Sequence, residues 1–287
     1  MTLNPASLDS NTLKLLERLR KLRGSSAVVR EMHRLLRESY YRAREVIYRR
    51  GAPTRLSDGT PVRLHPRLLG MRPEAYEPVV TALLARHLHV GSIVVDVGAH
   101  VGLHTLMFSR RVGSAGKVVA VEASPSNARL LKSHIDWNSC ANVELIESVV
   151  GDRECTTEFA YRADATDPGG FANSLAYDIG GVKRRVCMRT LDAICDGLFP
   201  DVIKIDVEGA ELMVLQGAEE LLDRAAPTLV IAVHPGPMRT LGAAPADLIT
   251  FLKARGYSAH HLDGSPAIEP GFEEIVFRKN TNSDEVS

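Results

Sequence analysis

Short apolar runs alternate with amphipathic segments along most of the chain. The runs Ile93–Val97 and Lys117–Val121 are apolar at nearly every position, whereas residues 126–138 repeat apolar side chains every three or four positions. Unbroken apolar runs are typical of strands buried on both faces, and the longer spacing is typical of the helices that cover them. The alternation predicts an α/β fold, with a mostly parallel sheet between two layers of helices.

This periodicity places the expected elements along the chain. The predicted strands cover residues 60–64, 93–97, 117–121, 143–146, 202–207, 228–233, 257–262 and 273–278. The predicted helices cover residues 73–89, 101–111, 126–138, 210–216 and 245–255. Residues 263–272 are too few and too rich in glycine and proline for a crossover helix, so the last two strands should pair antiparallel. The polar residues 152–189 interrupt the alternation and predict an insertion of short strands or a flap.

The first 55 residues differ in charge from the rest. They carry 13 Lys and Arg against 5 Asp and Glu, whereas the remainder carries 22 against 30. Leucines at three- and four-residue spacing predict two basic helices, separated at residues 24–26 and ended by Gly51 and Pro53. We therefore divide the chain into a basic helical extension, residues 1–55, and a larger domain, residues 56–287.

Composition also limits the class of protein. The four cysteines form no CxxC pair, so neither a zinc site nor a disulfide framework is expected. No apolar run approaches the roughly 20 residues of a membrane span, and no apolar leader is evident, so we expect a cytoplasmic protein. The basic extension is open to several roles: a homodimer contact, a lid on the site, peripheral attachment to a membrane over residues 1–50, or a plain solvated helix.

The stretch VVDVGAHVGLHT, residues 94–105, predicts a buried strand, a glycine turn and a helix. In a parallel sheet such a turn lies at the carboxyl ends of the strands, where ligands bind. The spacing of Gly98 and Gly102 lacks the middle glycine of a dinucleotide fingerprint, and no Lys-Ser or Lys-Thr follows it, as a P-loop requires. Glu122 at the next strand end suits the two hydroxyls of a ribose, and Asp96 could accept from a ligand ammonium group. These positions favour S-adenosylmethionine over a dinucleotide.

A second segment strengthens this interpretation. The stretch RTLDAI, followed by DVIKIDVEGAELMVLQGA from residue 201, resembles the FkbM family of S-adenosylmethionine-dependent methyltransferases, and the resemblance covers about residues 90–235. It implies a class I methyltransferase fold, which is Rossmann-like, with a seven-stranded, mostly parallel sheet and an antiparallel last strand. It also implies methyl transfer to a hydroxyl oxygen, often on a sugar or a polyketide-type natural product. His100 stands where an asparagine is common in the family, which should alter hydrogen bonding in the turn.

The cofactor side of the site is expected along the first three strand ends. Ser148 and Val149 follow the third strand, where the fold places the loop that closes over the adenine. The residues expected to hold the cofactor are Asp96, Gly98, Ala99, His100, Gly102, Glu122, Ser148 and Val149.

Charged residues gather at the end of the predicted strand 202–207. Lys204, Asp206 and Glu208 alternate there and therefore share one face. A buried charge is costly unless paired, so either a Lys204–Asp206 ion pair or a functional site explains them. His234 follows the next strand and should emerge at the same sheet edge. It suits a general base for a hydroxyl, or a ligand of a divalent cation such as Mg²⁺ together with Asp206 and Glu208, or a plain loop histidine.

The sequence therefore predicts an S-adenosylmethionine-dependent O-methyltransferase. Lys204, Asp206, Glu208 and His234 are expected on the acceptor side, and the acceptor is a small molecule or glycan rather than a nucleic acid. A nicotinamide-dependent oxidoreductase is one alternative, which the missing middle glycine disfavours. The other alternative is a catalytically inactive, methyltransferase-like scaffold that binds partners through its basic helices.

Overall fold

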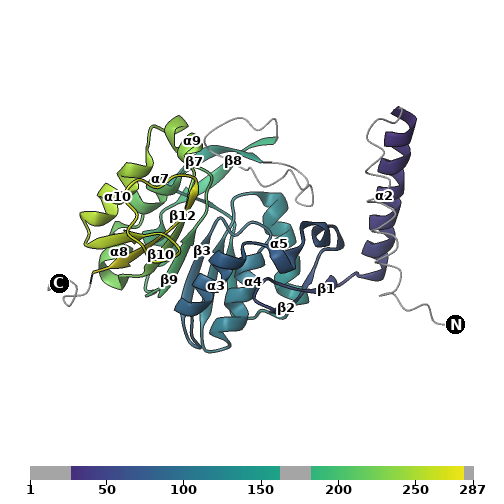
Figure 1. Ribbon diagram of the computed structural model, residues 1–287, viewed down its shortest axis with the longest axis horizontal. Helices are drawn as coiled ribbons and strands as arrows, with labels where there is room; N and C mark the ends of the chain where they lie inside the picture. Colours follow the sequence, from purple (N-terminus) through teal and green to yellow (C-terminus); the bar gives the residue numbers. More distant parts are fainter. Residues whose placement is uncertain (1–26, 162–181, 281–287) are drawn as a thin grey trace.

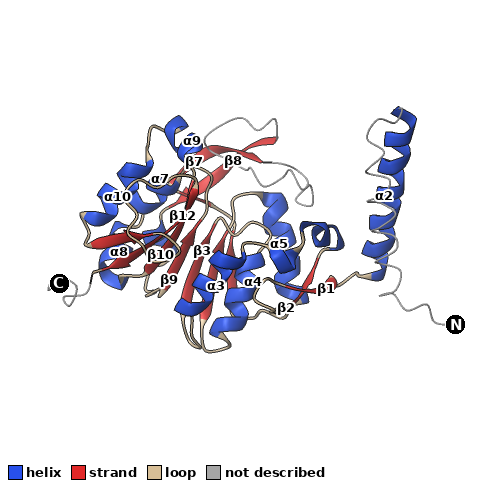
Figure 2. Cartoon of the chain, in the orientation of Figure 1, coloured by secondary structure: helices blue, strands red, loops and turns tan. Residues whose placement is uncertain are grey.

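The structure is a computed structural model that describes residues 27–161 and 182–280 (Figure 1). Its centre is a seven-stranded sheet with the order β11-β12-β10-β9-β3-β4-β5 (Figure 2). These strands are β3 (Ile93–Val97), β4 (Lys117–Val121), β5 (Val143–Ile146), β9 (Val202–Ile205), β10 (Thr228–Val233), β11 (Tyr257–His260) and β12 (Glu273–Lys279). β12 pairs antiparallel with both of its neighbours, and the other pairs are parallel. The class I methyltransferase sheet that the sequence predicts is confirmed.

Helices pack on both faces of this sheet. One face packs against α3 (Pro78–His87), α4 (Leu103–Val112) and α5 (Pro125–Trp137). The other face packs against α6 (Leu191–Ile194), α7 (Glu211–Gln216), α8 (Glu219–Ala225) and α10 (Pro245–Lys253). Further helical segments are α2 (Ala27–Ile47), α9 (Pro235–Thr240) and the 3-10 helices η1 (Pro66–Met71) and η2 (Pro73–Ala75).

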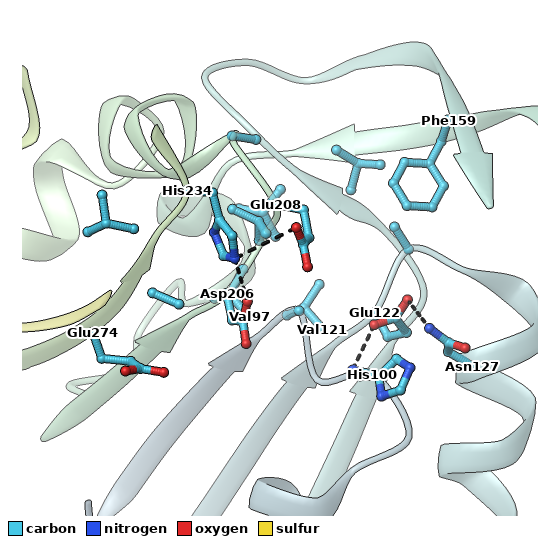
Figure 3. A pocket seen from close by; sticks show the side chains of 18 of the residues that line it. Val97, His100, Val121, Glu122, Asn127, Phe159, Asp206, Glu208, His234 and Glu274 are labelled. Carbon is cyan, nitrogen blue, oxygen red and sulfur yellow. Dashed lines mark hydrogen bonds and ion pairs between the residues drawn. The ribbon is translucent and has the colours of Figure 1, made fainter. Parts of the chain in front are cut away.

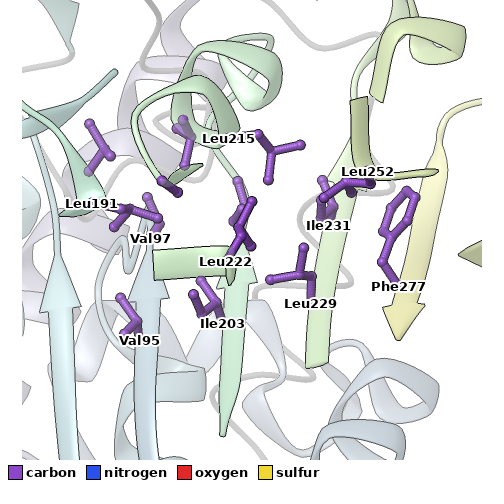
Figure 4. Close-up of a cluster of buried hydrophobic side chains, with 14 of the residues drawn as sticks. Val95, Val97, Leu191, Ile203, Leu215, Leu222, Leu229, Ile231, Leu252 and Phe277 are labelled. Carbon is purple, nitrogen blue, oxygen red and sulfur yellow. The ribbon is translucent and has the colours of Figure 1, made fainter. Parts of the chain in front are cut away.

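Alternating side chains explain why the strands are apolar throughout. In β9, Val202 belongs to the cluster with α4 and Ile203 to the cluster with α7 and α8, and each is at most 1% exposed. Figure 4 shows the cluster with α7 and α8, which includes Ile203, Leu215 and Leu222. Fully burying a side chain of this size contributes about 1.5–3 kcal/mol, so the two clusters hold the sheet between its helices.

Two smaller sheets accompany the central one. β1 (Ala52–Arg55) pairs with β2 (Pro61–Leu64), so the strand predicted over residues 60–64 is confirmed. β6 (Val149–Val150), β7 (Cys155–Tyr161) and β8 (Val182–Arg189) form a three-stranded sheet with the order β6-β8-β7. The insertion expected over residues 152–189 therefore contains short strands, while its middle lies outside the described residues.

The helix predicted over residues 73–89 is divided in two. η2 ends at Ala75 and α3 begins at Pro78, because Glu77 between them has φ 41°, a left-handed conformation that an α-helix does not contain. Pro78 then occupies the first turn of α3, where its missing N–H leaves no bond unmade. α6, α8 and α9 have no counterpart among the predicted elements, because such short helices carry few periodic positions.

The basic helix α2 stands beside the body of the protein in Figure 1. Arg67 of η1 holds it there, since its guanidinium donates to Glu38 and to Glu45. Among the side chains of α2 that the structure describes, the exposed large apolar ones are Met32, Leu35, Leu36, Val46 and Ile47. The second predicted basic helix is thus confirmed, whereas the first lies outside the described residues. None of the helices in residues 27–161 and 182–280 combines the length and apolar character needed to cross a bilayer.

Candidate functional site

A cavity of about 430 Å³ opens at the carboxyl ends of the central strands (Figure 3). Val97 ends β3, Val121 ends β4 and Val233 ends β10, and all three line the cavity. Asp206 follows β9 directly and lines it as well. The glycine turn, the second strand end and the acidic segment after β9 therefore meet at one edge of the sheet, where open α/β sheets bind ligands.

The glycine turn between β3 and α4 is shaped by close packing. Gly98 has φ 80°, and a Cβ at this position would overlap the carbonyl oxygen of Asp206. Gly102 has φ 90°, and a Cβ there would overlap the side chain of Leu131 in α5. Gly98 lines the cavity, whereas Ala99 and Gly102 do not. The first glycine thus brings the turn close to the acidic segment, and the second lets the turn pack on α5.

Glu122 supplies the carboxylate on the β4 side of the cavity. It is buried, and its two oxygens accept hydrogen bonds from the backbone amides of His100 (2.8 Å) and Ser124 (2.7 Å). The Asn127 side-chain amide also donates to it, at 3.4 Å. Burial raises the pKa of Glu122 to about 7 in spite of these bonds. Asn127 lines the cavity beside Glu122 and is a residue that the sequence did not indicate.

Strained backbone gathers around the cavity. Six non-glycine residues of the described chain have positive φ, and three of them line the cavity: Glu77 (41°), His100 (53°) and Glu208 (53°). Such conformations persist where the surrounding structure imposes them, often at functional sites. Histidine and asparagine are both enriched in this region of backbone space, so His100 can adopt the turn in place of the family's asparagine. Burial lowers the pKa of His100 to about 4, so its ring is neutral at pH 7.

Asp96 and Lys204 lie in adjacent strands and do not line the cavity. They are direct partners in the β3–β9 register, and both are buried. Asp96 accepts a hydrogen bond from the Thr105 hydroxyl (2.6 Å), and the Lys204 ammonium donates to Oδ2 of Asp206 (2.9 Å). Burial would raise the pKa of Asp206, but the charge of Lys204 lowers it. The Lys204–Asp206 ion pair considered from the sequence is therefore present, and Lys204 is a buried counter-ion between two carboxylates.

His234 faces the acidic segment from the end of β10 (Figure 3). Its Nε2 lies 3.8 Å from Oδ1 of Asp206 and 3.7 Å from Oε2 of Glu208, which is beyond hydrogen-bond distance. Its Nδ1 lies 2.7 Å from Oε1 of Glu211, a fully buried residue. Burial opposes protonation of the imidazole, but the bond to Glu211 and the neighbouring carboxylates raise the pKa of His234 overall. The sequence placed Glu211 only at the start of a helix.

The opposite part of the cavity is less charged. It is lined by Ser148, by Val149 of β6 and by Phe159 of β7. Phe159 lies across the cavity from His234 in Figure 3. The backbone carbonyls of Val149 (2.8 Å) and Cys187 (3.0 Å) both lie within hydrogen-bond distance of the Ser148 hydroxyl, whose single hydrogen bonds to one or is shared by both. Its hydrogen is therefore engaged by the backbone, and its oxygen can serve a ligand only as an acceptor.

Two further segments complete the cavity wall. Tyr76 and Glu77 lie between η2 and α3, and Phe272 precedes β12. Phe272 is 80% exposed, and its ring centroid is 5.2 Å from that of His234, in an edge-to-face arrangement. The sequence placed Tyr76 and Glu77 inside the helix predicted over residues 73–89 and Phe272 inside the loop 263–272, so it indicated none of them as a site residue. Only the proline after Glu77 signals a backbone that departs from the helix.

The lining of the cavity is acidic. Within residues 27–161 and 182–280, neither lysine nor arginine lines it. The carboxylates that line it are Glu77, Glu122, Asp206, Glu208, Glu273 and Glu274. Such a wall favours a cationic or neutral ligand and repels an anionic one.

Two family models match the sequence. The model of the methyltransferase FkbM domain matches residues 96–259, which is more than half of the chain. The model of protein-L-isoaspartate(D-aspartate) O-methyltransferase matches residues 10–155. The first match spans the glycine turn, Glu122, the acidic segment and His234. No curated protein matches the chain.

Several solved methyltransferase structures are similar to the chain. A methyltransferase FkbM from Methylobacillus flagellatus KT is 18% identical, with a TM-score of 0.43 over 66% of this chain and 43% of that one. A precorrin-6y C5,15-methyltransferase from Geobacter metallireducens GS-15 is 15% identical, with a TM-score of 0.42 over 71% of this chain and 89% of that one. A TehB-like SAM-dependent methyltransferase from Corynebacterium glutamicum ATCC 13032 is 16% identical, with a TM-score of 0.41 over 74% and 92%. The chain spans less than half of the first of these proteins.

Proposed function

Because the chain belongs to the FkbM family of S-adenosylmethionine-dependent methyltransferases, we propose that it methylates a hydroxyl oxygen on a sugar, glycan or polyketide-type acceptor. One observation carries the proposal: a single cavity holds Glu122 on one side and His234 with two carboxylates on the other. S-adenosylmethionine supplies a methyl group on a sulfonium, which an oxygen nucleophile attacks in line. The protein then has to bind the cofactor, orient the hydroxyl and remove its proton.

On the cofactor side, Glu122 is proposed to accept from the ribose hydroxyls. The two backbone amides that bond to it fix its position. Oε1 also accepts from Asn127, so Oε2, which accepts only from the His100 amide, keeps a free lone pair for a hydroxyl. Gly98 allows the ligand to approach the turn closely, and His100 and Ser148 flank the nucleoside with Val149. Residues that do not line the cavity would act indirectly. Ala99 and Gly102 shape the turn, and Asp96 and Asp206 are both neighbours of the Lys204 ammonium.

On the acceptor side, His234 is proposed to take the hydroxyl proton on Nε2. Asp206 and Glu208 lie 3.8 Å and 3.7 Å from this nitrogen, so a hydroxyl could approach all three groups. The two carboxylates would orient the hydroxyl, and Lys204 would keep Asp206 ionised. His234 gains a positive charge in this step, and the surrounding carboxylates stabilise it.

The same three side chains also fit a divalent cation. One atom each from Asp206, Glu208 and His234 lies within 4.8 Å of the others. Two carboxylates and an imidazole suit Mn²⁺ or Zn²⁺ better than Mg²⁺, which prefers an all-oxygen shell. A bound cation would hold the acceptor oxygen and lower its pKa, and His234 would then be a ligand instead of a base. Turnover before and after dialysis against a chelator distinguishes these two roles.

The cavity wall supports a neutral, hydroxyl-rich acceptor. A phosphorylated or nucleic-acid acceptor would meet carboxylates and no lysine or arginine of the described chain. Glu208 and Glu274 can accept from acceptor hydroxyls, and the exposed ring of Phe272 offers an apolar face for the C–H side of a sugar. These features favour a sugar over a wholly apolar polyketide.

We propose that the basic extension over residues 1–55 is a contact surface of the protein. Its helix α2 exposes Leu35 and Leu36 between arginines, which suits either a second copy of the chain or an anionic membrane surface. Light scattering and vesicle sedimentation of the full chain, with and without a Leu35→Glu/Leu36→Glu change, separate these partners. A change in neither measurement would leave α2 as a solvated helix.

Calorimetric titration with S-adenosylmethionine, its demethylated product and NAD tests the cofactor. Binding of the two sulfur compounds, followed by methyl transfer to a panel of hydroxyl acceptors, supports the proposal. Binding of NAD alone would favour an oxidoreductase. Binding of the sulfur compounds with no methyl transfer to any hydroxyl acceptor would favour the scaffold alternative.

A further inference from the structure

We propose that Glu211 is a positioning residue that holds His234 in the tautomer with its proton on Nδ1 and so presents Nε2 to the acceptor hydroxyl. This inference rests on the proposed function, because it assigns the partner of the proposed base. The hydrogen bond between Nδ1 of His234 and Oε1 of Glu211, at 2.7 Å, carries it.

Glu211 is held in place from two directions. Its Oε1 also accepts from the backbone amide of Gly209, at 2.9 Å. Gly209 has φ 112°, and a Cβ there would overlap Pro237, so the backbone that carries this amide packs tightly against α9. One carboxylate oxygen thus links the segment after β9 to His234, the residue that follows β10. The imidazole can therefore turn neither toward solvent nor by half a rotation without losing this bond.

A role in the helix alone does not explain Glu211. An acid at the first turn of a helix complements the helix dipole from the surface, where its charge stays solvated. Glu211 is instead 0% exposed, and its Oε2 has no hydrogen-bond partner among the residues that the structure describes. Burying a carboxylate is costly unless it is paired, and the side chain paired with it is His234. The buried pair is therefore better explained by an effect of Glu211 on the tautomer and orientation of the His234 ring.

The pair defines the path of the proton. A carboxylate only accepts, so Nδ1 must donate to Glu211, and the lone pair of Nε2 is left facing Asp206 and Glu208. When the acceptor O–H bond breaks, its proton forms a bond to Nε2 while the oxygen bonds to the methyl carbon. The sulfur keeps the electron pair of the broken C–S bond and becomes a neutral thioether. The imidazolium, stabilised by Glu211, then releases its proton to solvent.

A Glu211→Gln variant tests the role of the charge. It keeps the size of the side chain and an oxygen that can accept from both the Gly209 amide and Nδ1 of His234, but it removes the negative charge that stabilises the imidazolium. We expect kcat to fall at least ~100-fold, with the affinity for S-adenosylmethionine and the acceptor KM changed less than about threefold. Glu220→Gln, an exposed acid on α8, is the matched control and should leave kcat unchanged. Full activity of the Glu211→Gln variant would overturn the inference.

The tautomer can be measured without that variant. In ¹⁵N-histidine-labelled protein, two-bond ¹⁵N–¹H correlations distinguish Nδ1–H from Nε2–H, and a His234→Gln spectrum assigns the ring. We expect Nδ1–H for neutral His234; an Nε2–H ring would overturn the inference even if the Glu211→Gln variant did not fold. Failure of the proposed function has a different signature. In that case, the His234→Gln variant would remain active or no hydroxyl would be methylated.

Discussion

The raised pKa of Glu122 leads to a specific prediction for cofactor binding. A ribose hydroxyl donates to a carboxylate more strongly than to a neutral acid, so binding should follow ionisation of this group. Burial places the pKa of Glu122 at about 7, whereas that of His100, its neighbour in the cavity, is about 4. Between pH 6 and 8, the charge on this side of the cavity therefore changes at Glu122.

The size of the effect follows from this pKa. With a pKa of about 7, roughly a tenth of Glu122 is ionised at pH 6 and roughly nine-tenths at pH 8. If only the ionised form binds well, the affinity should rise about tenfold over this range, which is ~1.4 kcal/mol. A Glu122→Gln change should weaken binding at pH 8 by about 1.5–3 kcal/mol, because the ribose loses a charged acceptor. The variant should also lose the pH dependence.

The assay uses 5′-methylthioadenosine, a ligand with the nucleoside but without the amino-acid group. Its affinity is measured by calorimetry at several pH values, for the unchanged protein and for the Glu122→Gln variant. Because this ligand carries no amine or carboxylate, the ionisation observed belongs to the protein. Equal slopes for the two proteins would refute the assignment of the ribose to Glu122, as would an affinity that falls with rising pH.

Four further outcomes follow from the site. Since the folded-state pKa of Glu122 is raised, burial of its charge lowers the free energy of unfolding as pH rises from about 4.5 to 7. Glu122→Gln should remove up to about 3 kcal/mol of this fall, measured by urea titration at several pH values. If the free energy of unfolding depended on pH equally in the variant and the unchanged protein, the prediction would be wrong. His234→Ala should lower kcat about 10²–10⁴-fold with little loss of cofactor affinity. A fully active variant would show that His234 is neither the general base nor a ligand of a catalytic cation. Lys204→Met leaves Asp206 and Asp96 without their cation and should cost about 3–5 kcal/mol in the free energy of unfolding; a loss under 1 kcal/mol would contradict the counter-ion role. Phe272→Ala should raise the KM for a sugar acceptor while stability stays within about 0.5 kcal/mol, and an unchanged KM would remove the ring from the acceptor side.

The central sheet could be predicted because its strands are buried on both faces. Such strands leave unbroken apolar runs, and the spacing of Tyr257–His260 and Glu273–Lys279 leaves no room for a crossover helix. The break at Glu77 could not be predicted, because its left-handed backbone depends on the chain that packs around it. The proline after it gives only a weak local signal.

The acidic end of the site could be predicted for a similar reason. Parallel strands bring their carboxyl ends to one edge, so residues after β4, β9 and β10 must lie near one another. The burial of Asp96 away from the cavity depends on its register opposite Lys204, which the sequence does not state. Tyr76 lies in a segment whose spacing predicts one continuous helix, and Phe272 lies in a loop, so neither pattern shows that the residue reaches the cavity. Glu211 resembles any acid at a helix start until its burial is known.

The position of β12 between β10 and β11 has a consequence for synthesis of the protein. β10 and β11 both pair with β12, which follows both of them along the chain. While the ribosome is still translating residues before Glu273, β10 has an open edge and β11 has no sheet to join. An unpaired edge of an apolar strand is a template for association with other chains. The nascent protein is therefore most exposed to aggregation after β10 has emerged and before β12 is available to cover its edge.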